Sequence, residues 1–269
     1  MPSIPLPPPD PSELLATPDI SLVMPCYNEE AIVGQTIRRT LSAFRGAGHR
    51  LQLIAVDNGS KDRTGEIIQE YVDAGHPVVR VRVEQNQGYG YGILSGIPHA
   101  TAPWIGFIPA DSQVDAHETV HLFEEAVACE EPVLAKARRR FRMDGFTRKV
   151  VSVTFNGLFR LLWPNIRSFD INGLPKIMPR EVVRGMGLSS KDWFLDPEIM
   201  IKSYYLGVRV IEYSVFARMR SRGLSHVNAG TCVNFFAGLI RYRFSSELSV
   251  WRRATPMHVA SASSGSGGE

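Results

Sequence analysis

The chain has 269 residues, of which 44% are hydrophobic and 21% charged, and its formal net charge is +3 at pH 7. This composition is that of a globular protein with a sizeable core, and it excludes wholesale disorder and fibrous repeats. The small net charge does not indicate a nucleic-acid partner. Three cysteines without a CxxC pair predict neither a disulfide framework nor a cysteine zinc site, and they fit a reducing cytoplasm.

The two ends of the chain differ in composition from the middle. Residues 1–18 contain seven prolines, which predicts an extended N-terminal arm. Residues 246–269 end in serine and glycine and are expected to form a flexible tail. No apolar run reaches the roughly 18 residues that span a bilayer, and the N-terminus lacks the features of a signal peptide. We therefore expect a cytoplasmic protein that does not cross a membrane by itself.

Apolar segments of strand type and helix type alternate between these ends. Strands are predicted at 20–27, 51–56, 77–84, 104–108 and 132–137, and helices at 31–44, 62–74 and 116–129. Such alternation with short connections predicts a doubly wound, mainly parallel α/β sheet flanked by helices. In sheets of this kind, ligands bind beyond the carboxyl ends of the strands.

Acidic and amide side chains follow three of the predicted strands directly. Asn28–Glu30 follow the first, Asp57–Ser60 the second, and Asp111 with Gln113 the fourth. Each loop taken alone is explained by capping of the next helix. Three such loops on one sheet edge favour a site for a hard cation such as Mg²⁺ or Mn²⁺, which in turn can hold a diphosphate.

Four consecutive motifs resemble those of a known family. They are PCYNEE, AVDNGSKDRTGEI, NQGYGYGILSGIPHAT and FIPADSQVD. In this order they resemble the family 2 glycosyltransferases of the GT-A fold. Three later segments are similar to the polyprenyl-phosphate branch, typified by dolichol-phosphate mannose synthase: DINGLPK, DPEIMIKSYYLGVRVIEYSV and RSRGLSHV. The resemblance implies a GT-A (Rossmann-like) domain over residues 19–245, with C-terminal amphipathic helices.

The resemblance also implies a nucleotide-sugar donor and residues that bind it. The residues that match the nucleotide pocket are Pro25, Tyr27, Glu29, Asp57 and Ala110. Asp111 and Gln113 match the metal-binding end of the family's D-A-D-x-Q motif, so Mg²⁺ or Mn²⁺ is the expected cofactor. Asn58 stands where Asp is usual, and Pro109 stands at the first Asp of the metal motif. One carboxylate with Gln can still hold Mg²⁺ if the donor diphosphate supplies charge. An inactive nucleotide-binding relative is the alternative.

A basic stretch at 136–149, with seven Lys or Arg and one acid, leads into an amphipathic helix. One face of this helix is polar at a spacing of four: Arg148, Ser152, Asn156 and Arg160. Another face is apolar: Val151, Phe155, Leu158 and Leu162. Such a helix can lie at a membrane surface with its charges near phosphates, or it can face the core. The later stretch 233–251 leaves the same two interpretations open.

The resemblance favours the membrane interpretation. Relatives hold a lipid phosphate with residues that match Arg138, Arg148 and Ser152, and Arg220 matches an arginine that closes over the donor phosphates. These four residues and Asp111 are the expected catalytic residues. The implied reaction transfers a sugar with inversion from a UDP- or GDP-sugar to a polyprenyl phosphate. The protein would then be peripheral, at the inner face of the membrane.

The chemistry of the acceptor decides whether a general base is needed. A phosphate monoester is already anionic at neutral pH, so it needs no base. A soluble hydroxyl acceptor, such as a natural product or a glycan, is the alternative. It would require a base, for which Asp196 and Glu198 are the candidates; both are equally well explained as acids at a helix N-terminus.

Two other motifs indicate different chemistry and are rejected. The segment from His117 to His121 is a literal HExxH, but no further ligand follows at metzincin spacing. The glycine-rich segment 88–96 lacks GxGxxG spacing and follows the third predicted strand rather than the first. The sequence therefore predicts neither a zinc peptidase nor a nicotinamide enzyme.

Overall fold

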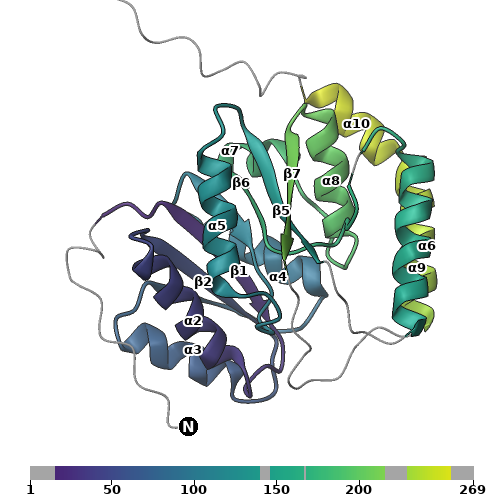
Figure 1. The fold of residues 1–269 in the computed structure, drawn as a ribbon. Helices are drawn as coiled ribbons and strands as arrows, with labels where there is room; N and C mark the ends of the chain where they lie inside the picture. The colour runs from purple at the N-terminus through teal and green to yellow at the C-terminus, as the bar shows by residue number, and fades with distance from the viewer. Residues whose placement is uncertain (1–15, 140–145, 167, 216–228, 256–269) are drawn as a thin grey trace, which may run out of the picture.

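A computed structural model describes residues 16–139, 146–166, 168–215 and 229–255 of the chain (Figure 1). The described residues form one sheet with the strand order β3-β2-β1-β4-β6-β5-β7. Its strands are β1 (Ile20–Cys26), β2 (Leu51–Asn58), β3 (Val78–Val83), β4 (Trp104–Phe107), β5 (Val133–Arg139), β6 (Lys176–Pro179) and β7 (Arg209–Val215). Within this sheet, β6 alone runs antiparallel to its neighbours. The predicted doubly wound, mainly parallel sheet is confirmed.

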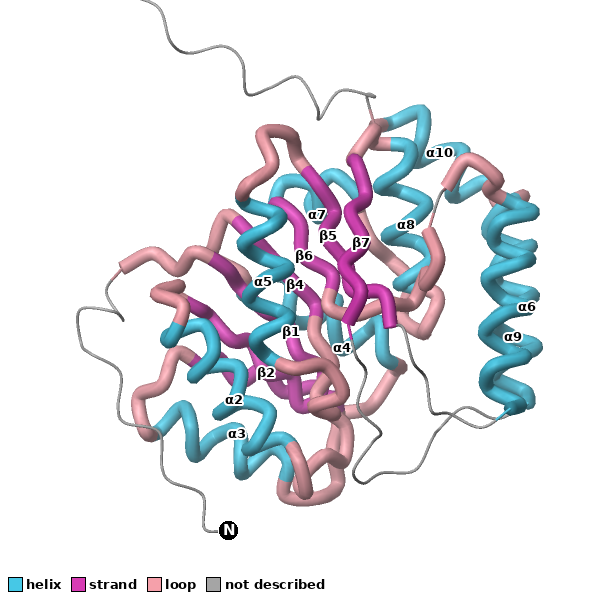
Figure 2. Tube along the Cα trace, viewed as in Figure 1, coloured by secondary structure: helices cyan, strands magenta, loops and turns pink. Residues whose placement is uncertain are grey.

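Helices cover both faces of the sheet (Figure 2). They are α2 (Val33–Gly46), α3 (Thr64–Asp73), α4 (Tyr89–Gly96), α5 (Ala116–Val127), α6 (Phe146–Leu162), α7 (Arg180–Met186), α8 (Leu195–Tyr205), α9 (Ala229–Arg243) and α10 (Ser246–Ala254), with a 3-10 turn at Ile97–His99. Side chains of α2, α3 and α5 belong to one buried cluster. Side chains of α4, α7 and α8 belong to another, which lies on the opposite face.

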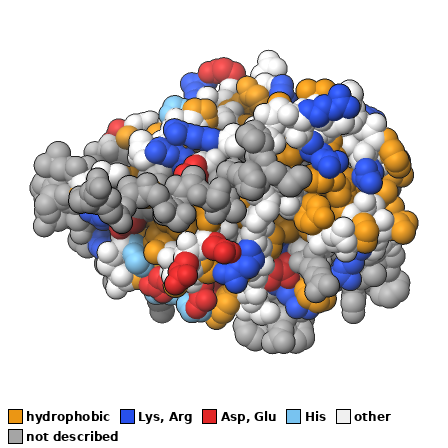
Figure 3. All heavy atoms as spheres, turned by 90° about the horizontal axis from the view of Figure 1, so that it is seen from above, with side chains coloured by type: hydrophobic (Ala, Val, Ile, Leu, Met, Phe, Trp, Pro, Cys, Tyr) orange, Lys and Arg blue, Asp and Glu red, His pale blue; other side chains and the backbone are white. Residues whose placement is uncertain are grey.

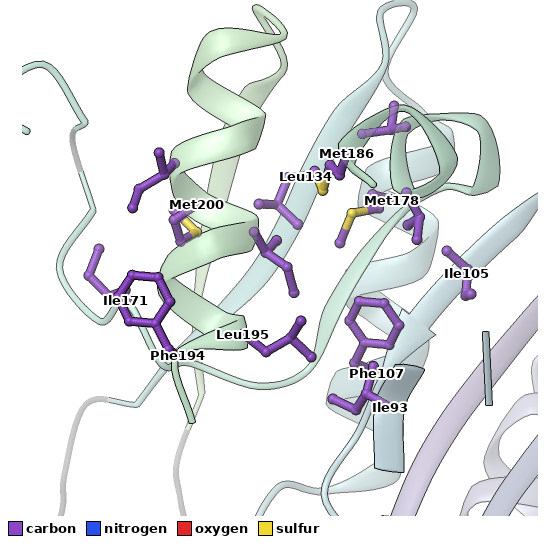
Figure 4. Packing of buried hydrophobic residues seen from close by; sticks show 14 of the residues in the cluster. Ile93, Ile105, Phe107, Leu134, Ile171, Met178, Met186, Phe194, Leu195 and Met200 are labelled. Carbon is purple, nitrogen blue, oxygen red and sulfur yellow. The ribbon is translucent and has the colours of Figure 1, made fainter. Parts of the chain in front are cut away.

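The alternation of side chains along β1 explains the two layers. Leu22 and Met24 point into the cluster with α2 and α5, whereas Val23 points into the cluster with α4 and α8. All three are fully buried, and each buried side chain of this size contributes about 1.5–3 kcal/mol. Figure 4 shows the second cluster, where Phe107 of β4 lies near Leu195 of α8. Burial on both faces explains why these strands appear as continuous apolar runs in the sequence.

Helices α6 and α9 lie side by side at one end of the molecule (Figure 1). The ring centroids of Phe155 and Phe236 are 6.1 Å apart, and further along both helices Arg243 Nε donates to the Leu162 carbonyl at 3.2 Å. The two helices therefore run parallel. Phe155 and Phe159 are buried in the core cluster that contains α8, so one side of α6 faces the core.

The C-terminal segment is helical where the sequence predicts a tail. Residues Ser246–Ala254 form α10, and the Ser245 side chain caps it by accepting from Leu248 N at 3.3 Å. Leu248 is buried, and Trp251, three residues on, packs against the same core cluster. The expected tail therefore does not begin at residue 246, because apolar side chains at helical spacing attach α10 to the domain.

Candidate active site

The ends of β1 and β2 bring three acidic side chains together. Cys26, the last residue of β1, is paired in register with Asp57 of β2. Burial raises the pKa of the Cys26 thiol well above its usual range, and the nearby carboxylates of Glu29, Asp57 and Asp62 raise it further. The family resemblance assigns two of these acids, Glu29 and Asp57, to the nucleotide pocket. In the structure both stand at the same edge of the sheet.

Reciprocal hydrogen bonds join the loops that follow β1 and β2. Glu29 N donates to Thr64 Oγ1 at 2.8 Å, and Lys61 N donates to Asn28 Oδ1 at 2.9 Å. Asn28 has a φ of 54°, a left-handed conformation that asparagine tolerates better than most residues. These contacts fix the turn that carries Tyr27 and Glu29 against the start of α3.

Asp57 is held in one orientation beneath the start of α3. Its Oδ1 accepts from Ser60 N at 3.1 Å, and its Oδ2 lies 3.3 Å from Arg80 Nη2. Gly65 makes this pair possible, because a Cβ there would lie 2.3 Å from Asp57 Oδ2 and 2.6 Å from Arg80 Nη2. Arg80 was not predicted from the sequence as a site residue. The alternation of Val and Arg in β3 could have indicated it, because this alternation places Arg80 and Arg82 on the partly exposed face of the strand.

Asn58, where the family usually has Asp, has a structural partner. Its side chain is buried, and Nδ2 donates to the Gly88 carbonyl at 3.0 Å. The adjoining Gly92 of α4 has no room for a side chain, since its Cβ would lie 2.9 Å from Pro25 Cβ and 3.0 Å from Asn58 Nδ2. The glycine-rich segment thus serves close packing of α4 against the ends of β1 and β2.

The loop after β4 presents the predicted metal ligands. Thr36 of α2 donates to the Ala110 carbonyl at 2.7 Å and shares a hydrogen bond of 2.6 Å with Ser112 Oγ. Ser112 has a φ of 54°, so the chain turns sharply between Asp111 and Gln113. Gln113 N donates to Asp111 Oδ1 at 3.1 Å. Both predicted ligands therefore lie on one turn. No local sequence pattern indicates the Thr36 anchor.

Arg138 lies at the same edge as Asp111. Strand β5 is antiparallel to β6, and β6 is antiparallel to β4, so the carboxyl ends of β4 and β5 point the same way. Arg138 is partly exposed near the end of β5. Arg148 and Ser152 are backbone positions of α6, but their side chains lie outside what the structure describes. Arg220 also lies outside the described residues.

The two candidate bases at the start of α8 are buried in ion pairs. Lys176 Nζ lies 2.5 Å from Asp196 Oδ1, and Lys202 Nζ lies 2.6 Å from Glu198 Oε1. Glu198 also accepts from the backbone N–H groups of Ser189 and Ser190, at 3.1 and 2.9 Å. A carboxylate with this many donors and no exposure is a structural anchor for the segment before α8. Glu198 is therefore a poor general base, and Asp196 is committed to Lys176.

The sequence model described as "Glycosyl transferase family 2" matches residues 21–187 of the chain. This segment holds the loops after β1, β2 and β4 together with Arg138. The chain belongs to glycosyl transferase family 2, as the order of the motifs predicted.

Among curated proteins, the chain is similar to undecaprenyl-phosphate 4-deoxy-4-formamido-L-arabinose transferases. The protein from Edwardsiella ictaluri is 31% identical over 142 residues, which are 52% of this chain and 43% of that protein. The one from Pectobacterium carotovorum subsp. carotovorum is 33% identical over 143 residues, 53% of this chain and 43% of that protein. The match thus covers less than half the length of these relatives.

A solved structure shares the fold. Glucosyl-3-phosphoglycerate synthase from Mycobacterium tuberculosis, crystallised with Mn²⁺, uridine diphosphate and glucosyl-3-phosphoglycerate, has a TM-score of 0.67 with this chain. The identity is 19%, and the alignment covers 84% of this chain and 80% of that one. A likeness at this identity concerns the fold alone, and it confirms the predicted GT-A class.

Proposed function

We propose that the protein transfers a sugar, with inversion, from a nucleoside diphosphate sugar to a polyprenyl phosphate at a membrane surface. One observation carries the proposal: Asp111, which follows β4, and Arg138, near the end of β5, lie at the same sheet edge, with only β6 between these strands. A donor diphosphate with its cation and an anionic acceptor would meet at this edge. The names of the curated relatives support an undecaprenyl-phosphate acceptor.

The donor side consists of the joined loops after β1, β2 and β4. Pro25, Tyr27 and Glu29 stand at the end of β1, and the fixed carboxylate of Asp57 is available to read a base from the end of β2. Uracil and guanine both offer N–H donors to a carboxylate, so the base stays open between UDP and GDP. The uridine diphosphate in the solved structure with the same fold favours UDP.

The Asp111 loop fits a divalent cation that binds together with the donor. Asp111 and Gln113 offer hard oxygen atoms from one turn, the kind of ligand that Mg²⁺ and Mn²⁺ prefer. No group of three or more His, Cys, Asp or Glu able to hold a metal occurs among the described residues. The described residues therefore supply few ligands to the cation, and the diphosphate and water would complete the site. When bound, the cation supplies charge that stabilises the leaving diphosphate.

The acceptor side is basic, and the two candidate bases are not accessible from it. Arg138, with Arg148 and Ser152 as sequence positions of matching role, would hold and orient the acceptor phosphate. Arg220 would close over the donor phosphates. Asp196 and Glu198 are buried and paired with lysines. An acceptor that is already ionised needs no proton removed, and so this arrangement favours a phosphate over a hydroxyl group.

The outer surface of α6 and α9 fits contact with a membrane. Leu161, Ile240 and Phe244 are 76%, 49% and 76% exposed, and Arg241 and Arg243 are exposed beside them. Figure 3 shows hydrophobic side chains interspersed with Lys and Arg on this side of the molecule. Apolar side chains flanked by arginines are suited to an anionic bilayer surface. None of the described helices combines the length and apolar character that a membrane span requires.

Vesicle sedimentation tests the membrane surface. The protein should sediment with vesicles that contain phosphatidylglycerol and much less with phosphatidylcholine alone. Leu161→Ser with Phe244→Ser should abolish the difference. Val127→Ser, on α5 and 49% exposed in the wild type, is the matched control and should bind like the wild type. Equal sedimentation of the double variant and the wild type would remove this surface from the proposal.

Thermal unfolding with UDP, GDP, CDP, dTDP and ADP, each with and without Mn²⁺, tests the donor site. A nucleotide at a hundred times its Kd adds about 2.7 kcal/mol, which raises Tm by roughly 5–10 °C for a domain of this size. We expect a shift with UDP or GDP that depends on Mn²⁺. The absence of a shift with every nucleotide would identify an inactive relative, in which Pro109 marks a lost donor site.

A further inference from the structure

One aromatic ring contacts two arginines at the acceptor side of the sheet edge. The Cζ atom of Arg138, on β5, is 4.0 Å from the centroid of the Phe169 ring, and the Cζ atom of Arg160, on α6, is 5.2 Å from it. Phe169 is 59% exposed, Arg160 is exposed, and Arg138 is partly exposed. A solvent-borne ligand can therefore reach both guanidinium groups.

The backbone of Phe169 is held by a hydrogen bond to Glu212, which forms an ion pair with Lys136. Glu212 of β7 accepts from Phe169 N at 3.2 Å and also from Ser168 Oγ. Lys136 of β5, which is fully buried, lies 3.0 Å from Glu212 and donates to the carbonyl of Asp170. These bonds hold the residues on both sides of Phe169, so the ring is carried by a rigid support although it is exposed.

The same segment is tied to α6 and to the core. Arg160 Nη2 donates to the Ser168 carbonyl at 3.3 Å, and Ile171 N donates to Asn156 Oδ1 at 3.3 Å. The Ile171 side chain is buried beside Phe194 in the core cluster (Figure 4). Asn156 and Arg160 both lie on the polar face of α6, and both form hydrogen bonds to the segment that contains Phe169. The sequence also places Arg148 and Ser152 on this face, at one-turn spacing.

Neither of the two arginines forms an ion pair within the described part of the chain. No carboxylate there lies within 4.0 Å of Arg138 or Arg160, whereas Lys136, Lys176 and Lys202 each have one. The π face of a ring attracts each guanidinium, but the two like charges repel each other. A ligand with two negative charges would relieve this repulsion and would accept hydrogen bonds from both groups.

We propose that Phe169 and Arg160 belong to the acceptor site. Phe169 is a positioning residue whose ring contacts both the Arg138 and the Arg160 guanidinium groups, and the two arginines bind one phosphomonoester dianion. The inference rests on the proposed function and adds two residues that the family motifs do not indicate. A lipid phosphate and a soluble phosphomonoester share this chemistry, and the experiment distinguishes them.

Calorimetric binding of farnesyl phosphate in detergent tests the assignment, with farnesol and glycerol 3-phosphate as the comparison ligands. We expect Phe169→Leu and Arg160→Gln each to raise the Kd of farnesyl phosphate by about 5- to 30-fold. Phe169→Trp, which keeps a π face, should stay within about twofold of the wild type. Arg252→Gln is the matched control, because the Arg252 guanidinium also lies over a ring, 4.2 Å from Tyr205. It should bind like the wild type.

The outcomes separate this inference from the proposed function. If the wild type binds farnesyl phosphate but Phe169→Leu and Arg160→Gln bind it equally well, the inference is wrong and the proposed acceptor stands. If the wild type does not distinguish farnesyl phosphate from farnesol, both are overturned. Glycerol 3-phosphate binding that depends equally on Phe169 supports the phosphate site but assigns it to a soluble acceptor. Unchanged Kd and KM for the donor in Phe169→Leu, with a raised acceptor KM, exclude a general structural defect.

Discussion

Lys176, the first residue of β6, and Asp196, near the start of α8, form an ion pair of 2.5 Å at the sheet edge that carries the candidate site. Both side chains are almost entirely buried. Burial lowers the pKa of Lys176 to about 8, even though Asp196 acts in the opposite direction. The pair joins the middle of the sheet to α8, and its charge state should change within an accessible pH range.

Lys176→Met should therefore alter how stability depends on pH. The pKa of Lys176 is lower in the folded protein than the reference value of 10.5. Between about pH 8 and 10.5 the unfolded chain holds a proton that the folded protein releases, so the wild type gains up to about 1.4 kcal/mol per pH unit relative to the variant. Urea unfolding of both proteins across this range measures the gain. A constant difference would show that Lys176 keeps its proton when folded.

Gly65→Ala should weaken nucleotide binding without a general loss of structure. The added methyl group would displace Asp57 from Arg80, because its Cβ would lie 2.3 Å from Asp57 Oδ2. We expect the Kd of the preferred nucleotide to rise at least about tenfold, which corresponds to about 1.4 kcal/mol. Gly46→Ala is the control, since nothing lies within 4 Å of a Cβ there. Equal affinity in both variants would remove Asp57 from the donor site.

Asp111→Asn should remove the part of nucleotide affinity that depends on the metal. Loss of the carboxylate leaves the turn with uncharged oxygen atoms only, which bind Mn²⁺ or Mg²⁺ weakly. Titration of the nucleotide with and without Mn²⁺ should give similar Kd values in the variant, unlike the wild type. Asp115→Asn, the neighbouring cap of α5, should preserve the metal effect. A full metal effect in Asp111→Asn would place the cation elsewhere.

Glu198→Gln should reduce stability far more than catalysis. Removal of one partner from a buried ion pair costs about 3–5 kcal/mol, and Lys202 would be the charge left unpaired. Urea unfolding should show this loss, while the folded fraction at low temperature retains most of its kcat. A variant of wild-type stability with kcat reduced a hundredfold would instead make Glu198 the general base, and the acceptor would then be a hydroxyl group.

The donor half of the site could be predicted because local sequence determines it. Asp57 stands near the end of β2 and Asp111 follows β4, and both strands are largely apolar. The apolar run reveals each strand, and the polar residue marks its end. The hydrogen bonds that orient these groups could not be predicted. Thr36 reaches Ala110 across 74 positions of the chain, and no local pattern encodes such a contact.

The acceptor half of the site and the elements that support it were harder to predict, because this part of the molecule contains buried charges. Lys176 begins the short strand β6, and α8 contains Glu198 and Lys202 at buried positions, so neither segment shows a regular apolar period. The charge of each lysine is balanced by a carboxylate: Asp196 of α8 for Lys176, and Glu198, one turn earlier in α8, for Lys202. Phe169 was missed for a related reason: an aromatic residue in a loop acquires meaning only when β5 and α6 bring two arginines onto its ring.

Product analysis of the transfer reaction tests the central claim most directly. The protein would be incubated with radiolabelled UDP- and GDP-sugars, Mg²⁺ or Mn²⁺, and either undecaprenyl phosphate or undecaprenol in detergent. We expect label in the lipid fraction with undecaprenyl phosphate alone, and loss of that transfer in Arg148→Ala with nucleotide binding retained. Equal label with undecaprenol, or no label in the lipid fraction with either acceptor, would contradict the proposed function.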